Sequence, residues 1–180
     1  EITDPTAADD GFELIDLNAM QLQSMPLRVR RVIVRLGSAA VVFHSTNLRI
    51  RTRTTIVPGL VAFVAFGPHS RGTVNGLPIR PGLMLSAAAE TEVVFVAEAG
   101  YESIAILLPP QDIREHLAAR QREDEFHLPN CMEPLQVDTE RARGMFAWGK
   151  RLVDTAARNP ALFNDGIRER AVARDELLEA

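Results

Sequence analysis

The sequence predicts a mainly β protein, a sandwich or small barrel of the jelly-roll kind, followed by two or three helices. Seven or eight short apolar runs lie at close, regular spacing between residues 27 and 109. They are separated by segments that force a turn: Val57-Pro58-Gly59, Asn75-Gly76, Pro81-Gly82 and Ala99-Gly100. No helix-length pattern separates the runs, which argues against parallel βαβ units. From residue 138 onward, apolar side chains recur at steps of three and four, the spacing of a helix.

The first strands are predicted from alternation. Residues 27–36 alternate arginine imperfectly with valine and isoleucine, and residues 39–43 follow as a partner strand after a Gly37-Ser38 turn. In residues 48–53 the alternation is strict and places three arginines on one face: Arg49, Arg51 and Arg53. We expect a half-buried strand whose arginines form a solvated face. An anion-binding ladder is the less favoured interpretation.

The middle of the chain predicts a buried strand and several hairpins. Residues 59–66 are apolar on both faces, so this strand should lie between two layers or form a pocket wall. Asn75-Gly76 supplies the two positive φ values of a type I′ turn and predicts a hairpin over residues 73–79. The remaining apolar runs predict three further strands: 83–87, 93–97 and 103–108.

The C-terminal part predicts helices. A short amphipathic helix should run from Pro109-Pro110 to about residue 122, and a polar connector should follow over residues 123–133. Asp138 or Thr139 can cap the next helix, which Asn159-Pro160 closes. Its apolar stripe comprises Ala142, Met145, Phe146, Gly149, Leu152, Val153 and Ala156. A last helix is expected from about residue 164.

Composition excludes several classes of protein. The length of 180 residues and the 46% hydrophobic content fit one compact domain. A net charge of −4 does not favour direct binding of nucleic acid by this chain. The single cysteine, Cys131, cannot form an intrachain disulfide, and no apolar run approaches the roughly 20 residues that span a bilayer. We expect a cytoplasmic protein without membrane contact.

Few residues predict chemistry. The histidines are isolated from one another and from carboxylates at ligand spacing: His44, His69, His116 and His127. Cys131 is interpreted as a spare thiol, and no serine lies in a nucleophile elbow. No glycine-rich loop precedes a helix. We therefore expect no catalytic residue, no metal, no cofactor and no enzymatic activity.

Two candidate sites follow from alternation and aromatic content. The candidate ligand-binding residues are Arg35, Phe63, Phe66, His69, Met84 and Phe95. On the helix that begins near residue 138, Trp148 widens the apolar stripe to a second flank, so part of the helix could pair with a second copy of the chain. The candidate dimer residues are Met145, Trp148 and Leu152. Trp148 as an ordinary core residue is the alternative.

Five segments, in their order along the chain, carry a resemblance to a known family. They are Arg35-Leu36-Gly37, Val57-Pro58-Gly59, Asn75-Gly76-Leu77-Pro78-Ile79-Arg80-Pro81-Gly82-Leu83-Met84, Ala99-Gly100-Tyr101 and Ile104-Ala105-Ile106-Leu107-Leu108-Pro109. In this pattern, residues 12–180 resemble the N-terminal domain of AraC-family transcription regulators. The subgroup they resemble has sensor regions like that of the ethanolamine-operon regulator. The pattern consists of strands, turns and glycines and is not a strict signature.

The resemblance implies a cupin-like β domain that senses a small effector, followed by helices that dimerise. We expect a flexible arm at residues 1–11, the sensor domain at 12–109, and a helical segment at 110–180 that packs on the barrel. The C-terminal DNA-binding domain of the family, with two helix-turn-helix units, is absent from these 180 residues and would follow residue 180. The implied partners are an unknown small effector, a second copy of the chain, and DNA only through the missing domain.

Two other functions stay open at this point. A metal-dependent enzyme of the cupin type would need a bound metal ion. A protein-interaction module would bind no small molecule at all. The binding of a ligand, measured as a thermal shift, separates the sensor from the interaction module.

Overall fold

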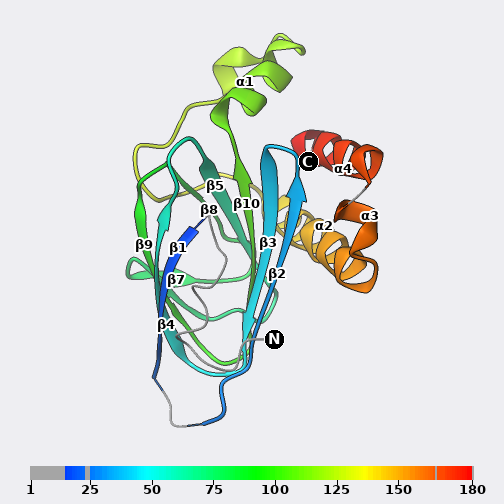
Figure 1. Ribbon diagram of the computed structural model, residues 1–180. Helices are drawn as coiled ribbons and strands as arrows, with labels where there is room; N and C mark the ends of the chain where they lie inside the picture. Colours follow the sequence, from blue (N-terminus) through cyan, green and yellow to red (C-terminus); the bar gives the residue numbers. More distant parts are fainter. Residues whose placement is uncertain (1–14, 23–24, 165, 180) are drawn as a thin grey trace.

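Two antiparallel sheets pack face to face, and helices cover the outside of one of them (Figure 1). The computed structural model describes residues 15–22, 25–164 and 166–179. The arm predicted at residues 1–11 lies outside the described residues. The architecture is mainly β with C-terminal helices, so the predicted fold class, a small barrel of the jelly-roll kind, is confirmed.

The first sheet has five strands in the order β1-β4-β9-β6-β7. Their bounds are β1 (Ile15–Gln21), β4 (Ile50–Ile56), β9 (Glu92–Ala97), β6 (Gly72–Val74) and β7 (Leu77–Ile79). The second sheet has six strands in the order β11-β8-β5-β10-β3-β2. Their bounds are β11 (Glu133–Pro134), β8 (Met84–Ala87), β5 (Val61–Phe66), β10 (Tyr101–Leu108), β3 (Ala39–Thr46) and β2 (Val29–Leu36).

Two strands were not predicted from the sequence. β1 pairs along the whole of β4, from Ile15 opposite Ile56 to Gln21 opposite Ile50. Its sequence, IDLNAMQ, contains aspartate and asparagine, which are depleted in strands, so its pairing depends on the neighbouring strand. β11 has two residues within the predicted connector and pairs with β8.

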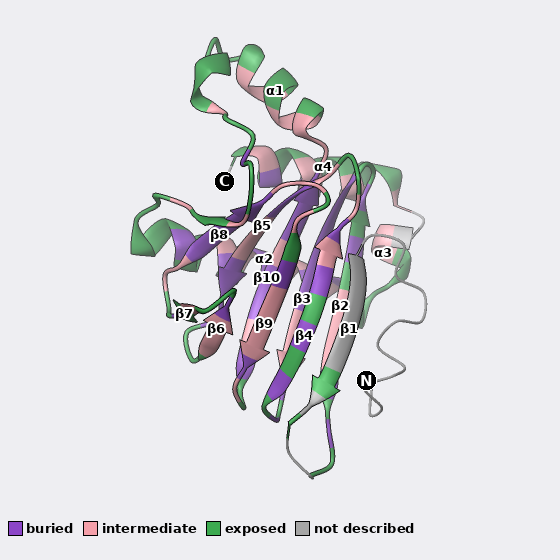
Figure 2. Cartoon of the chain, turned by 90° about the vertical axis from the view of Figure 1, so that its left-hand side faces the viewer, coloured by how far each residue is buried: buried purple, intermediate pink, exposed green. Residues whose placement is uncertain are grey.

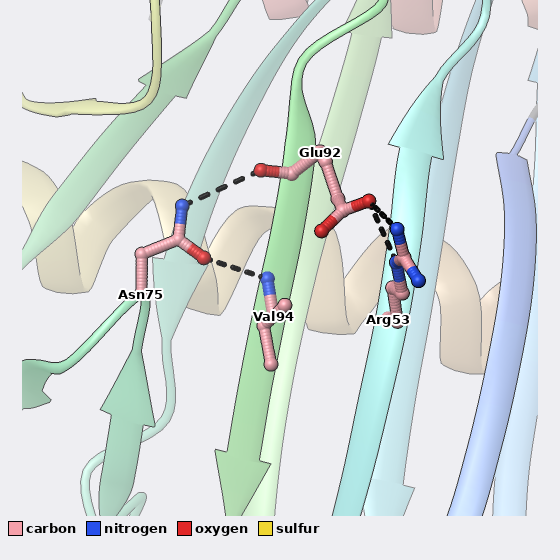
Figure 3. Close-up of polar contacts among 4 residues, drawn as sticks. All are labelled: Arg53, Asn75, Glu92 and Val94. Atoms are coloured by element: carbon pink, nitrogen blue, oxygen red, sulfur yellow. Dashed lines mark hydrogen bonds and ion pairs between the residues drawn. The ribbon is translucent and has the colours of Figure 1, made fainter.

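The predicted hairpin is present between β6 and β7. Asn75 and Gly76 have φ values of 45° and 80°, both in the left-handed region, as a type I′ turn requires. The side chain of Asn75 also accepts a hydrogen bond from the backbone N–H of Val94 at 2.8 Å and donates to the carbonyl of Glu92 (Figure 3). These two hydrogen bonds attach the turn to β9, so the hairpin of β6 and β7 extends the five-stranded sheet.

The arginines in and directly before β4, namely Arg49, Arg51 and Arg53, are exposed and point away from the interior. Arg53 forms an ion pair with Glu92 (Figure 3), and Arg49 forms one with Glu98 at 3.1 Å. These side chains are solvent-exposed, and their charges are balanced by glutamates near the neighbouring strand β9. The favoured interpretation, a solvated face, agrees with this arrangement better than an anion-binding ladder does.

The helices are α1 (Pro110–Ala118), α2 (Thr139–Arg158), α3 (Ala161–Asn164) and α4 (Ile167–Glu179). Asp138 caps α2 by accepting a hydrogen bond from the backbone N–H of Arg141 at 2.7 Å, as predicted. α1 is shorter than predicted and has no buried residue (Figure 2). Among the described residues, no helix is both long and apolar enough to cross a membrane.

The six-stranded sheet is buried on both faces, which creates two cores. One core fills the space between the sheets, and the other lies between the six-stranded sheet and the helices α2 and α4. β5 takes part in both, as its doubly apolar sequence predicted. At the second core, Phe43 of β3 lies under two cations, Arg30 and Lys150, which also bind Asp154. Burial alone would raise the pKa of Asp154, but its hydrogen bonds with Lys150 and Arg30 hold that pKa below its usual value.

Candidate functional site

A cavity of about 90 Å³ lies between the two sheets. Strand alternation determines its walls, because every second side chain points inward. From the six-stranded sheet the walls are Arg31, Val42, His44, Ala62, Val64, Leu85, Ala87, Tyr101, Ser103, Ala105 and Leu107. From the five-stranded sheet they are Ile50, Thr52, Thr54, Ile56, Val93, Phe95 and Ala97, and Met132 adds a side chain from the loop before β11.

Polar side chains in the cavity gather on neighbouring strands. Arg31 of β2 lies opposite His44 of β3, and His44 lies opposite Ser103 of β10. These three residues therefore form one row across three strands, on the face that lines the cavity. Tyr101, two residues before Ser103 on the same face, packs its ring edge-on to His44 with centroids 6.2 Å apart. We call Arg31, His44, Tyr101 and Ser103 the polar row.

The two titratable rings of the polar row are uncharged at neutral pH. Burial, and to a smaller extent the charge of Arg31, lowers the pKa of His44 from 6.5 to about 3. Burial raises the pKa of Tyr101 above its ordinary value, although its hydrogen bond with Ser103 opposes this change. A neutral imidazole has one N–H donor and one acceptor nitrogen, and the hydroxyls of Tyr101 and Ser103 can donate. Arg31 adds a permanent positive charge.

Thr54 presents an unsatisfied hydroxyl to the cavity. Its residue is 7% exposed, and its Oγ1 has no hydrogen-bond partner among the residues that the structure describes. Buried hydroxyls are normally hydrogen-bonded, because an unpaired one loses its hydration without compensation. A molecule bound in the cavity can therefore supply the hydrogen-bond partner that the hydroxyl of Thr54 lacks among the described residues.

The structure places one of the six predicted ligand-binding residues on the cavity wall, namely Phe95. Phe66 is buried in the same core and packs edge-on to Tyr101, but it does not line the cavity. Phe63 and Met84 face the helices, and Arg35 and His69 are exposed.

The difference between the predicted residues and the cavity wall has a physical reason. Residues 59–66 are apolar on both faces, so the sequence does not show which face points inward, and the large aromatic residue, Phe63, packs with the helix-facing core. The strict alternation of residues 48–53 does predict which side chains line the cavity. If the arginines face solvent, then Ile50, Thr52 and Thr54 must face the interior, as they do.

The predicted dimer residues lie on one side of α2. Met145, Trp148 and Leu152 are partly buried against the helix-facing core. The indole Nε1–H of Trp148 donates to Glu176 of α4 at 3.3 Å. Trp148 and Leu152 also line a groove between α2, α3 and α4, next to Val172, which is 50% exposed. Within the chain, these residues therefore help to join α2 to the sheet and to α4.

Two further features, the single cysteine and the metal-ligating side chains, were considered as possible sites of chemistry. Cys131 is exposed. In the part of the chain that the structure describes, no three His, Cys, Asp or Glu side chains gather as ligands of a metal ion would.

No protein-family model and no curated protein sequence matches the chain. Among solved structures, the fold is similar to the crystal structure of the AraC-like transcriptional activator CuxR, with a TM-score of 0.53 and 11% sequence identity. The match covers 91% of this chain and 60% of CuxR, so the chain spans less than two thirds of that protein. Ectoine synthase from P. lautus also matches, at a TM-score of 0.37 and 16% identity, over 65% of this chain and 81% of the enzyme. At such identities the likeness to CuxR concerns the fold alone.

Proposed function

We propose that the chain is the effector-sensing region of an AraC-type transcription regulator. The observation that carries the proposal is the cavity between the sheets, with an apolar wall, a polar row on neighbouring strands, and an unpaired hydroxyl at Thr54. Ligand sites of this kind are mostly apolar with a few polar groups that fix the orientation of the ligand. The likeness of the fold to an AraC-like activator supports the same function. The narrower resemblance to the ethanolamine-operon subgroup stays a prediction.

The cavity has a direct structural connection to the C-terminal helices. β10 contributes Tyr101, Ser103, Ala105 and Leu107 to the cavity and continues through Pro109 into α1. In α1, Asp112 accepts a hydrogen bond from the hydroxyl of Ser38 at 2.6 Å. The same carboxylate forms an ion pair with Arg174 of α4 at 2.9 Å. Arg120, just beyond α1, forms a further ion pair with Glu179 of α4. A change in the position of β10 would therefore reach α4 through α1.

In this proposal, an effector binds one arrangement of barrel and helices more tightly than another and shifts the population toward it. The effector is bound and not converted. The helices α2 and α4 join two copies of the chain, and DNA is bound by a domain outside these 180 residues. A protein with this role works in the cytoplasm.

Ligand-dependent stabilisation tests the proposal. A screen of small molecules should find one that raises Tm. A ligand at a hundredfold excess over its Kd stabilises the folded chain by about 2.7 kcal/mol, which is a rise of roughly 5–10 °C for a protein of this size. Ala105→Leu should abolish the shift, because Ala105 lines the cavity between Val42 and Val64. Ala157→Leu, the same change at an exposed site on α2, is the matched control and should leave the shift intact.

The sensor function would be rejected if the screen found no compound whose Tm shift is abolished by Ala105→Leu.

The dimer is tested separately by light scattering. The wild-type chain should have twice the mass of one copy at micromolar concentration. Val172 lines the groove together with Trp148, and Val172→Asp should lower the measured mass toward that of one copy. Ile167 is 76% exposed and lies outside the groove, so Ile167→Asp is the control and should leave the mass unchanged. A wild-type monomer at high concentration contradicts the dimer.

A further inference from the structure

We propose that the molecule bound in the cavity is small and uncharged, with a hydrocarbon body and one oxygen that hydrogen-bonds to the hydroxyl of Thr54. Short alcohols and ketones have this chemistry. The inference rests on the proposed sensor function and specifies the chemical class of its effector. Three properties of the cavity lead to it: its volume, the effect of its wall on charge, and the hydroxyl that Thr54 contributes to that wall.

The volume limits the size of the ligand. The cavity measures about 90 Å³. A water molecule occupies about 30 Å³ in the liquid, and an engineered cavity of about 150 Å³ holds benzene. By this scale the cavity accommodates about three to six non-hydrogen atoms. Sugars, nucleotides and long fatty acids exceed this size.

The wall requires a mostly apolar body. Most lining side chains are aliphatic or aromatic and come from both sheets, among them Val42, Ile50, Val64, Leu85, Phe95 and Leu107. A polar group placed against these side chains would lose its hydrogen bonds to water without replacement. The larger part of the ligand is therefore a hydrocarbon.

The cavity disfavours charge of either sign. His44 would become positive by binding a proton, and Tyr101 would become negative by losing one. Their rings lie 6.2 Å apart on the same wall, so both report on the same surroundings. Burial is the largest cause both of the lowered pKa of His44 and of the raised pKa of Tyr101, and both side chains stay neutral at pH 7. A charged ligand in this place would lose its hydration in the same way.

The charged side chain on the wall does not reverse this preference. Arg31 is half-buried and already takes part in an interaction within the chain, so the cavity is not built around a free positive charge. For a cation, the lining residues that the structure describes include no Asp or Glu as a counter-charge. An uncharged ligand needs no counter-charge of either sign.

Thr54 provides a place for one polar group. The residue is 7% exposed, and its Oγ1 has no hydrogen-bond partner among the described residues. A hydroxyl both donates and accepts, so it can pair with an alcohol or with the carbonyl of a ketone. The hydroxyls of Tyr101 and Ser103, in contrast, are bonded to each other. One oxygen on the ligand therefore satisfies Thr54, and further polar groups would face the apolar wall.

The test compares ligands of similar size that differ in their polar end. They are 1-butanol, 2-butanone, butyrate, butylammonium and the hydrocarbon cyclopentane, and 1-octanol tests the limit of size. Dissociation constants come from NMR titration of methyl groups on the wall, those of Val42 and Leu107, at pH 7 and constant ionic strength. The methyl groups of Ile167, which is 76% exposed and does not line the cavity, are the internal control.

We expect 1-butanol and 2-butanone to shift the wall methyl signals to saturation and to leave those of Ile167 in place. Butyrate and butylammonium should bind about tenfold or more weakly, because each must give up the hydration of its charge. 1-Octanol should also bind more weakly than 1-butanol because it exceeds the cavity. Binding of butyrate or butylammonium as tightly as 1-butanol overturns the inference.

A variant tests the role of the hydroxyl. Thr54→Val should weaken the binding of 1-butanol by about three- to tenfold, the effect of one hydrogen bond, and should leave the binding of cyclopentane unchanged. Thr55→Val, the same change at the neighbouring position on the opposite face of β4, is the matched control and should leave both unchanged. Equal binding of 1-butanol by the wild type and Thr54→Val overturns the inference.

The failure of this inference differs from the failure of the sensor function. If no alcohol or ketone shifts the wall methyl signals, but a compound of another class gives a Tm shift that Ala105→Leu abolishes, the uncharged class is wrong and the sensor function stands. If no compound of any class does so, the sensor function itself fails.

Discussion

Gly149 of α2 lies directly against Ile104 of β10, so closely that a β-carbon added at Gly149 would be 2.7 Å from Cγ2 of Ile104. Ile104 is fully buried beneath the helix. The absence of a side chain at position 149 therefore sets how closely α2 packs on the strand that also lines the cavity.

Gly149→Ala should destabilise the chain by about 1–3 kcal/mol, because overpacking forces the helix or Ile104 to move. Denaturant unfolding measures this change. Gly144→Ala on the same helix is the matched control. No atom lies within 4 Å of its added β-carbon, so it should stabilise α2 by about 0.5–1 kcal/mol. Equal effects of the two substitutions would contradict the close contact at Gly149.

Thr54→Val should stabilise the ligand-free chain by about 1 kcal/mol, because it removes a buried hydroxyl without a partner among the described residues and keeps the shape of the side chain. Thr46→Val is the control. Thr46 is also buried, but its hydroxyl donates to the carbonyl of Leu48 at 3.0 Å, so this change should destabilise the chain. Thermal unfolding of both variants tests the difference in sign. Destabilisation by Thr54→Val would show that its hydroxyl has a partner in solution.

The pKa of His44 predicts a loss of stability in acid. Its folded-state pKa is lowered from 6.5 to about 3, so between these values the unfolded chain binds a proton that the folded chain does not. This contribution is fully present above pH 6.5 and is lost as the pH falls toward 3. The loss is at most about 1.4 kcal/mol per pH unit, and less where water reaches the ring.

Urea unfolding at pH 7 and pH 4.5 measures this effect. His44→Gln keeps a polar side chain that does not titrate, so the variant should lose less stability than the wild type over this range. Arg31, opposite His44, keeps its charge throughout, and the hydroxyls of Tyr101 and Ser103 do not ionise there. An identical loss in both proteins would mean that His44 is solvated in the folded chain.

Asp112 is predicted to hold α1 against α4. Asp112→Ala removes the acceptor for Ser38 and the ion pair with Arg174, so hydrogen exchange in α4 should become faster. The expected loss of stability is about 1–2 kcal/mol. Glu115→Ala, on the same helix, removes a side chain that bonds Gln111 within α1 and should leave α4 unchanged. Unchanged exchange in Asp112→Ala would remove the proposed route from β10 to α4.

Local patterns were sufficient to predict most elements of the fold. The type I′ hairpin at Asn75-Gly76, the cap at Asp138 and the buried stripe of α2 depend on residues close in sequence, so they could be predicted from it. β1 and β11 could not, because their pairing depends on strands distant in sequence. The cavity wall was only partly predictable for the same reason.

The sequence by itself therefore determined the fold class, the order of most strands and helices, and the solvent-facing side of β4. Only the tertiary structure decided which face of the doubly apolar strand β5 meets the other sheet, and it brought Arg31, His44 and Ser103 into one row. The physical reason is that alternation assigns residues to two faces but does not say which face is inside when both are buried. The register between strands, which is a long-range property, makes that choice.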